Sequence, residues 1–314
     1  MSKRCLYCYQ ALTKAETDFH EKCSTRFFGT PNPPLLDLSK KEMERMAKDI
    51  ILRSVAVTGV QPKLSLTIDK TPDDPKSSRI TIVGALGGNY IMKPQSEELE
   101  SLPENEDLTM HLAGICGIKT AAHSLLRTTT GELVYITKRF DRLKGTKLHC
   151  EDLCQLTETL TENKYSSSME KVGKAIRKYS TFPLLDVLSF FEITLFSYLT
   201  GNSDMHLKNF SILRDEKQNY VLAPCYDLLN VRLAYSQDAE EMALPINARK
   251  NKITSKDFDA FGVNIGLNEK QMKAVYMKFS GMKKELLQCI MNSFLSKEQK
   301  AAYRELLTKR MKVM

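Results

Sequence analysis

The sequence predicts an α+β protein whose N-terminal part is rich in strands and whose C-terminal part is mainly helical. Apolar and polar residues alternate over residues 64–68, as in a strand with one buried face. Beyond residue 150 the apolar residues recur at helical spacing. The length of 314 residues is sufficient for two lobes, each with its own core. We therefore expect a small N-terminal segment over residues 1–34, a strand-rich lobe over 35–141 and a helical lobe over 142–314.

The composition is that of an ordinary globular chain. Apolar side chains make up 42% and charged ones 27%, which excludes fibrous, collagenous and disordered classes. The net charge of +8 suits an anionic partner, but it does not choose among nucleotides, tRNA, DNA and acidic proteins. The apolar run over residues 182–199 is interrupted by Asp186 and Glu192, so we expect a core helix and no membrane span. The first residues carry no apolar run typical of a secretion signal, so we expect a cytoplasmic location.

Residues 1–34 hold cysteines and a histidine with the spacing of a structural zinc site. Cys5 and Cys8 form a C-x2-C pair, and His20 and Cys23 form an H-x2-C pair. A segment this short cannot build a core of its own, so a bound metal would supply its folding energy. The alternative is three incidental cysteines and a surface histidine. We expect Zn²⁺ in a structural cap without sequence-specific contact to nucleic acid, because few basic residues lie nearby.

The expected helices and strands follow from periodicity and from turn residues. A helix is expected over residues 36–54, where methionines and isoleucines recur at helical spacing. A loop is expected over residues 72–75, which contain two prolines and two aspartates. The strands are expected over residues 64–68, 80–83, 90–92 and 134–137. The later helices are expected over residues 167–177, 184–199, 269–278, 282–294 and 296–314.

Side chains able to do chemistry follow the long apolar helix. Asp204 and Asn209 reproduce the D-x-x-x-x-N spacing of a protein-kinase catalytic loop, and Asp227 follows the next expected strand as a magnesium-binding aspartate does. The spacing matters because one rigid turn must bring an acid to the acceptor hydroxyl and an amide to a metal. Taken singly, Asp204 could cap a turn, His206 could be a buried hydrogen-bonding residue and Asp227 could begin a loop. Their order behind the strand lysine Lys93 favours phosphoryl transfer.

Seven short motifs, in order along residues 50–245, together resemble the HipA toxin kinases. They are residues 59–64, 91–94, 102–106, 138–142, 151–155, 201–210 and 226–228. The resemblance is greatest to the short HipT-like form, because only about fifty residues precede the loop at Gly59. It implies a bilobal protein-kinase-like fold and a serine/threonine kinase that uses ATP and Mg²⁺. The resemblance also implies that this kinase is the toxin of a bacterial toxin–antitoxin system. Kinases of this family often phosphorylate aminoacyl-tRNA synthetases.

The resemblance implies a role for each matching residue. Asp204 would be the catalytic base, and Asn209 and Asp227 would hold Mg²⁺. Lys93 would bind the α- and β-phosphates with Glu106 as its ion-pair partner. The remaining residues would contact the nucleotide: Thr58, Gly59, Val60, Gln61, Pro62 and Lys63 over the phosphates, Lys138, Arg139 and Phe140 at the adenine, His206 and Lys208 near the γ-phosphate, and Tyr226 beside Asp227.

Two departures from the family pattern concern the phosphate loop. Gly59 is its only glycine, so the G-x-G-x-x-G pattern of ordinary protein kinases is absent. Family members commonly carry an autophosphorylated serine three residues before this glycine, where this chain has Ala56. We therefore expect a regulatory phosphate on Thr58 first and on Ser54 second, where roughly two added negative charges would oppose nucleotide binding.

The short form also implies partners, namely a small HipS-like protein that supplies a missing N-terminal piece and a HipB-like DNA-binding antitoxin. Two other functions stay open. Asp204, His206 and Asn209 also fit the D-x-H-x-x-N pattern of small-molecule phosphotransferases of the aminoglycoside and choline kinase type. A catalytically inactive, zinc-bearing module that binds nucleic acid or an antitoxin would need a damaged site, whereas Lys93 and Asp227 are present with the other site residues.

Overall fold

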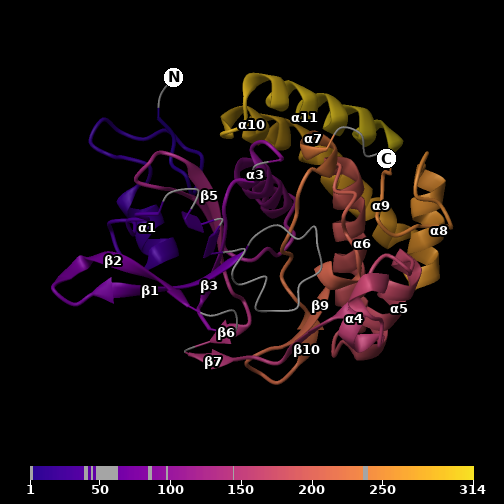
Figure 1. Ribbon diagram of the computed structural model, residues 1–314. Helices are drawn as coiled ribbons and strands as arrows, with labels where there is room; N and C mark the ends of the chain where they lie inside the picture. Colours follow the sequence, from indigo (N-terminus) through magenta and orange to yellow (C-terminus); the bar gives the residue numbers. More distant parts are fainter. Residues whose placement is uncertain are drawn as a thin grey trace. The chain divides into compact units, whose positions relative to one another are not determined.

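The computed structural model shows a protein of mixed helices and sheets (Figure 1). It describes residues 3–38, 42–43, 45–46, 63–83, 87–96, 98–143, 145–235 and 240–314. Contacts divide the chain into two compact units, which are called unit 1 and unit 2 below. Unit 1 comprises Met1–Leu108, Ala121–Arg139 and Asn292–Leu295, and unit 2 comprises Thr109–Thr120, Phe140–Met291 and Ser296–Met314.

Unit 1 is built on a five-stranded antiparallel sheet with the order β2-β1-β3-β5-β4. Its strands are β1 (Leu64–Thr71), β2 (Asp74–Val83), β3 (Tyr90–Lys93), β4 (His123–Arg127) and β5 (Leu133–Lys138). The four strands expected in this region are confirmed, and β4 was not predicted. The loop expected over residues 72–75 is shorter than predicted, because β2 begins at Asp74. Pro75 is tolerated there because β2 is an edge strand, where one face of the backbone needs no ladder partner.

Residues 3–34 precede the sheet and are called the Cys/His segment below. This segment shares the hydrophobic core of unit 1. Leu6 and Phe27 are buried in one cluster with Leu66, Met92 and Val134 of the sheet. The helix α1 (Glu21–Phe28) contributes its apolar face to this cluster and ends at Gly29, whose φ of +85° is the left-handed conformation that favours glycine. Burial of these side chains removes apolar surface from water and stabilises the segment on the sheet.

Part of the helix expected over residues 36–54 is described. Met43 is helical and buried in the same core, and Met46 packs against it. Leu36 forms an isolated bridge with Thr128. Most of the predicted range lies outside the described residues.

The helix α3 (Leu102–Ile115) was not predicted. Its residues 102–108 group with unit 1, and its residues 109–115 group with unit 2. Leu108, Met110, Leu112 and Ala113 are all fully buried, so the apolar residues occupy several sides of the helix. A helix buried on several sides lacks the single apolar stripe from which a helix is read in a sequence.

Unit 2 is mainly helical, as predicted. Its larger helices are α5 (Met169–Tyr179), α6 (Pro183–Thr200), α8 (Ser255–Ile265), α9 (Glu269–Gly281), α10 (Lys283–Asn292) and α11 (Lys297–Arg310). A three-stranded sheet with the order β10-β9-β8 lies among them, formed by β8 (Cys150–Asp152), β9 (Ser211–Arg214) and β10 (Tyr220–Leu222). Shorter elements are β6 (Arg142–Leu143), β7 (Thr146–Lys147), α4 (Leu153–Leu156), α7 (Val231–Ala234) and the 3-10 turns Thr161–Asn163, Leu207–Asn209 and Met311–Val313. All five expected helices are confirmed, and α8 was not predicted.

The helix α6 forms the centre of unit 2. It begins with Pro183 at its first turn, where a missing N–H leaves no bond unmade. It packs against α5, α8 and α11, and residues 190, 191 and 193–200 are all buried. Among the described residues, this helix has the length and apolar composition needed to cross a membrane, and 61% of it is buried within the protein. Its burial agrees with the predicted core helix.

Candidate active site

Lys93 forms a buried ion pair with Glu106 in unit 1. The Nζ of Lys93, at the end of β3, lies 2.6 Å from the Oε1 of Glu106 in the second turn of α3, and the two side chains are 4% and 3% exposed. The register of β3 and β5 places Lys93 opposite Tyr135, whose ring centroid is 5.5 Å from the same Nζ. Desolvation of two charges this deep costs several kcal/mol per ion, so the pair depends on close geometry. The ion pair expected between Lys93 and Glu106 is present.

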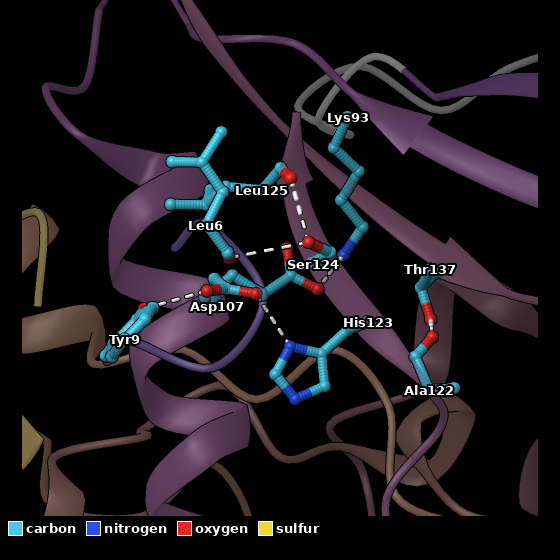
Figure 2. Close-up of polar contacts among 10 residues, drawn as sticks. Leu6, Tyr9, Lys93, Asp107, Ala122, His123, Ser124, Leu125 and Thr137 are labelled. Carbon is cyan, nitrogen blue, oxygen red and sulfur yellow. Dashed lines mark hydrogen bonds and ion pairs between the residues drawn. The ribbon is translucent and has the colours of Figure 1, made fainter. Parts of the chain in front are cut away.

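A second polar cluster surrounds Asp107, the next residue of α3 (Figure 2). The hydroxyl of Tyr9 donates to its Oδ2 at 2.7 Å, and the Nδ1 of His123 lies 2.7 Å from its Oδ1. The carbonyl of Leu6 accepts hydrogen bonds at 3.4 Å from the hydroxyl of Ser124 and, at the same length, from the backbone of the following residue. The segment that carries the predicted zinc ligands therefore contacts both α3 and β4.

The four predicted zinc ligands lie together in unit 1. One ligand atom from each of Cys5, Cys8, His20 and Cys23 lies within 4.8 Å of the others. The Nδ1 of His20 is 3.4 Å from the Sγ of Cys8 and 3.6 Å from the Sγ of Cys23. The other ring nitrogen, Nε2, is 3.1 Å from the carbonyl oxygen of Ala11, so it donates there and leaves the Nδ1 lone pair facing the sulfurs.

The chemistry of this cluster fits a cation. Burial and the neighbouring sulfurs of Cys5 and Cys8 raise the pKa of Cys23 to about 12. Burial is also the main cause of the raised pKa of Cys8. A bound divalent ion reverses this balance, because thiolates are stabilised by direct coordination. Three sulfurs and one imidazole nitrogen are the donor set of a closed structural zinc site.

The candidate catalytic loop begins directly after α6 in unit 2. Gly201 ends the helix with a φ of +79°, and its N–H donates to the carbonyls of Ser197 and Tyr198. The side-chain amide of Asn209 then donates to the backbone carbonyl of Asp204 at 2.9 Å. This bond closes the turn between the predicted base and the predicted metal ligand. It leaves the side-chain oxygen of Asn209 as the group suited to a hard cation.

His206 lies in the same electrostatic neighbourhood as two acidic residues of the loop region. Burial lowers the pKa of His206, and the carboxylates of Asp204 and Asp227 act in the opposite direction. Its Nδ1 is buried and has no hydrogen-bond partner among the described residues. Asp227 is partly buried and has a φ of +59°, a conformation that costs free energy for a residue other than glycine. Such backbone strain is concentrated at functional sites.

Tyr165 contacts the predicted base. Its hydroxyl donates to the Oδ1 of Asp204 at 2.5 Å. Its ring stands edge-on to the ring of His206, with centroids 5.0 Å apart. Burial and the bond to Asp204 raise the pKa of Tyr165, so the phenol stays protonated as a donor.

Lys208 and Tyr226 are fixed by neighbours in unit 2. The Nζ of Lys208 lies 2.6 Å from the Oδ2 of Asp152, the residue that caps α4. The hydroxyl of Tyr226 donates to the backbone carbonyl of Lys208 at 2.8 Å, and the ring of Tyr226 lies 5.4 Å from that of Phe140. Three predicted nucleotide contacts are thus brought together around the catalytic loop.

The predicted adenine-reading segment has part of its backbone already bonded. The N–H of Lys138 donates to Ala122 at 2.8 Å, and the N–H of Arg139 donates to Asn89 at 2.9 Å. Lys63 is exposed immediately before β1. The other predicted residues of the phosphate loop and its regulation lie outside the described residues: Ser54, Thr58, Gly59, Val60, Gln61 and Pro62.

Sequence reasoning missed several residues that contact the predicted site. Asp107 follows Glu106 directly in an acidic stretch of the sequence, where no signal marks it as a buried residue. Tyr9, His123 and Tyr165 carried no such signal, because their partners are distant in sequence.

A model of the HipA-like C-terminal domain family matches residues 55–286 of the chain. A putative kinase of Haemophilus influenzae is 29% identical over 244 residues, which are 69% of this chain and 69% of that protein. A putative kinase of Sinorhizobium fredii is 32% identical over 218 residues, 66% of this chain and 49% of that protein. The serine/threonine-protein kinase toxin HipA of Shewanella oneidensis is 26% identical over 235 residues, 68% of this chain and 52% of that protein. The chain thus spans about half the length of the last two relatives.

Two solved structures resemble the fold. One is a complex of HipA, HipB and operator DNA from Shewanella oneidensis, with a TM-score of 0.70 and 20% identity over 90% of this chain and 72% of the matched chain. The other is the proinflammatory kinase CtkA of Helicobacter pylori, with a TM-score of 0.54 and 18% identity over 78% of this chain and 92% of that chain. At these identities the two structures support the predicted kinase-like α+β fold and carry no residue roles.

Proposed function

This chain belongs to the HipA-like C-terminal domain family, and on that basis we propose that it is an ATP- and magnesium-dependent serine/threonine protein kinase. The observation that carries the proposal is the ion pair between Lys93 and Glu106, 2.6 Å long and almost fully buried. In protein kinases an ion pair of this kind, between a strand lysine and a helix glutamate, prepares the lysine to bind nucleotide phosphates. A buried ion pair often adds no more stability than apolar side chains would add in its place, so stability alone does not explain this one. A function for the pair in binding phosphates explains it better.

In the proposed reaction, Asp204 accepts the proton of the acceptor hydroxyl. The hydroxyl oxygen forms a bond to the γ-phosphorus of ATP while the bond from that phosphorus to the β,γ-bridging oxygen breaks, so ADP leaves. Asp204 is exposed and sits on a turn closed by Asn209, which suits a group that must meet an external substrate. Little covalent work falls to the protein, so positioning supplies most of the rate.

The remaining residues bind and orient the nucleotide in this proposal. Asn209 and Asp227 hold Mg²⁺, which neutralises charge on the phosphates when bound. Lys93 contacts the α- and β-phosphates. His206 and Lys208 line the γ-phosphate. The hydroxyl of Tyr226 holds the loop in place by donating to the backbone carbonyl of Lys208.

Adenine recognition falls to the segment from Lys138 to Phe140. Because the N–H groups of Lys138 and Arg139 already donate within unit 1, we assign the adenine-facing N–H to Phe140 or to a residue after it. Thr58 to Lys63 cover the phosphates, and Thr58 or Ser54 carries a regulatory phosphate. These loop assignments rest on the sequence.

We extend the proposal to the biological role. The HipA relative is named as a toxin, and the solved relative is a complex with HipB and DNA. The proposed role here is the toxin of a HipA- or HipT-type toxin–antitoxin system in the cytoplasm, with a translation-related protein such as an aminoacyl-tRNA synthetase as substrate. A HipS-like small protein and a HipB-like antitoxin are the proposed partners.

We also propose that Cys5, Cys8, His20 and Cys23 bind one structural Zn²⁺. When bound, the ion links the two ligand pairs and stabilises the segment against the sheet. The support is the four converging ligand atoms and the His20 ring held by Ala11.

Transfer of labelled phosphate from γ-labelled ATP with Mg²⁺ tests the kinase proposal. The parent chain is expected to label itself or a protein in a bacterial lysate, and Asp204→Asn is expected to lose about a hundredfold or more of the rate. Asp215→Asn is a matched control, because Asp215 is partly exposed and accepts hydrogen bonds within its own turn from Lys217 and Asn219. Phosphoproteomics after induced expression of parent and Asp204→Asn then identifies the acceptor. Absence of any protein label, or label on an aminoglycoside or choline instead, would overturn the proposal.

A further inference from the structure

Glu106 and Asp107 are adjacent residues of α3 that are anchored to different parts of unit 1. Glu106 is 2% exposed and pairs with Lys93 of β3. Asp107 is fully buried and is held by Tyr9 and His123, each at 2.7 Å. Neighbouring residues on a helix point about 100° apart, so the two carboxylates leave the same turn in different directions.

The contacts of Asp107 are of a kind that fixes a helix in rotation. An ionised carboxylate only accepts hydrogen bonds, so the Tyr9 hydroxyl and the His123 Nδ1 both donate to it. One donor comes from the Cys/His segment and the other from β4 (Figure 2). Charge-assisted bonds from two directions resist a turn of α3 about its axis in either sense. Any such turn would carry the Glu106 carboxylate away from Lys93.

The network returns to the ion pair through stacked rings. The ring of His123 lies 6.0 Å from that of Tyr135 at an angle of 24°, and Tyr135 lies beneath the Nζ of Lys93 at 5.5 Å. Lys93, Glu106, Asp107, His123 and Tyr135 thus form a closed circuit of contacts within unit 1. A closed set of contacts of this kind fixes the position of the lysine relative to the glutamate.

Tyr9 ties the circuit to the Cys/His segment. It follows Cys8 directly, and its φ of +61° is strained for a tyrosine. Its ring packs edge-on against Phe294 at 5.2 Å. Backbone strain persists only where the surroundings hold it, and here the holding groups are the ligand-bearing turn on one side and Asp107 on the other.

We propose that Asp107 is a positioning residue of the kinase site, which sets Glu106 against Lys93, and that Tyr9 couples the Cys/His segment to it. The proposal rests on the proposed kinase function for its kinetic consequence. Its structural part, the orientation of α3, is independent of that function. Burying a carboxylate costs free energy, and an apolar side chain would fill the same position at less cost. A residue that only filled space would therefore not be expected to be an aspartate, which favours a positioning role for Asp107.

The test uses Tyr9→Phe, Asp107→Asn and the double variant in the full chain. Tyr9→Phe removes one hydroxyl and keeps the ring, so it is the variant most certain to fold. Tyr90→Phe is the matched control, since it removes another buried hydroxyl of unit 1, one that donates to the carbonyl of Phe27 at 3.0 Å and has no contact with α3 among the described hydrogen bonds. Zinc content is measured in every variant, so that loss of metal is separated from loss of the contact.

Two readouts are expected to change together. Hydrogen–deuterium exchange over residues 102–108 rises in Tyr9→Phe and Asp107→Asn and stays at the parent level in Tyr90→Phe. The value of kcat falls about tenfold or more in both single variants, while the KM for the protein acceptor is unchanged, because only the phosphate-binding geometry is lost. The double variant falls no further than Asp107→Asn, because Tyr9 acts through Asp107.

The outcomes separate this proposal from the proposed function. If the parent transfers no phosphate, the kinase proposal fails and the exchange experiment still decides the positioning role. Unchanged exchange over residues 102–108 in both single variants overturns that role. So does a fully active Asp107→Asn, or a double variant whose kinetic loss equals the two single losses combined.

Discussion

The hydroxyl of Tyr165 donates a hydrogen bond of 2.5 Å to the Oδ1 of Asp204, the carboxylate that we assign as the catalytic base. A phenol therefore occupies one of the two carboxylate oxygens that, in the proposed function, are available to the hydroxyl of a serine or threonine substrate. Because burial and the bond to Asp204 raise the pKa of Tyr165, the contact persists across the physiological pH range.

Removing the Tyr165 hydroxyl should therefore free the base. In Tyr165→Phe we expect kcat/KM for the protein acceptor to rise about fivefold, since a hydrogen bond of about 1 kcal/mol no longer competes with the substrate. The KM for ATP should not change. Steady-state kinetics with each substrate varied in turn measures both values, and a loss of activity in Tyr165→Phe would instead make the phenol a required part of the site.

The buried ion pair predicts a separation of stability from activity. Glu106→Gln leaves the Lys93 ammonium buried without its carboxylate, which should lower the free energy of unfolding by about 3 kcal/mol and remove most activity. The double variant Lys93→Met with Glu106→Leu replaces both charges by apolar groups and should recover most of that stability without recovering activity. Urea unfolding and phosphate transfer measure the two effects.

A control for this experiment is the exposed pair between Lys273 and Glu269 on α9, which are 68% and 76% exposed. Glu269→Gln should change neither stability nor activity, because exposed ion pairs contribute little. Recovery of activity in the apolar double variant would show that the charges serve only the fold.

The Cys/His cluster predicts a metal content that can be counted. The purified chain should contain one Zn²⁺ by elemental analysis, and Cys8→Ser should contain much less, with a Tm lower by about 5 °C or more. Leu6 and Phe27 explain the thermal effect, because the segment that the ion would stabilise contributes them to the core of unit 1. Cys289→Ser removes a cysteine outside the cluster and should keep its zinc. An equal metal content in all three proteins would reject the assigned ligands.

The stability of unit 2 should depend on pH through Asp257. Burial alone would raise the pKa of this carboxyl, but hydrogen bonds from Asn247 and Thr254 outweigh it and hold the pKa below its ordinary value. A lowered folded-state pKa adds stability that is complete above the unfolded pKa of about 3.9 and is lost as the pH falls through the folded value. Asp257→Asn should therefore be less stable than the parent at pH 7, and the difference should shrink below about pH 4. Urea unfolding at both pH values checks this, and a constant difference would contradict it.

The sequence was sufficient where one element shows its periodicity by itself. The strand β1 and the helices α5 and α6 have a buried face or a continuous apolar run, and each was predicted close to its observed bounds. The helix α3 has no single apolar stripe, because it is buried on several sides. The edge strand β4 has four buried residues in a row, and its sequence shows no alternation of apolar and polar residues.

The candidate site divides in the same way. Asp204 and Asn209 could be placed together because their spacing of five positions within one turn fixes their relation, and Lys93 and Glu106 because each lies in a motif of the family. Asp107 and Tyr165 could not be predicted, since Tyr9 lies 98 positions and His123 16 positions from Asp107, and Asp204 lies 39 positions from Tyr165, so these groups meet only through tertiary folding. Local spacing carries the chemistry of a loop, whereas the groups that position or cover it come from the packing of distant segments.

The packing around the end of α6 restricts position 201 to glycine. A methyl group on Gly201 would come within 2.7 Å of both the Oδ1 of Asn230 and the Cδ2 of Leu306, so no other residue fits without displacement. The loop from Asn202 onward thus takes its starting point and direction from a closely packed helix end. The position of this loop therefore depends on the packing of the interior of unit 2. Substitutions in the core around α6 should reduce catalysis before they unfold the chain, and such variants would be found among inactive but folded proteins.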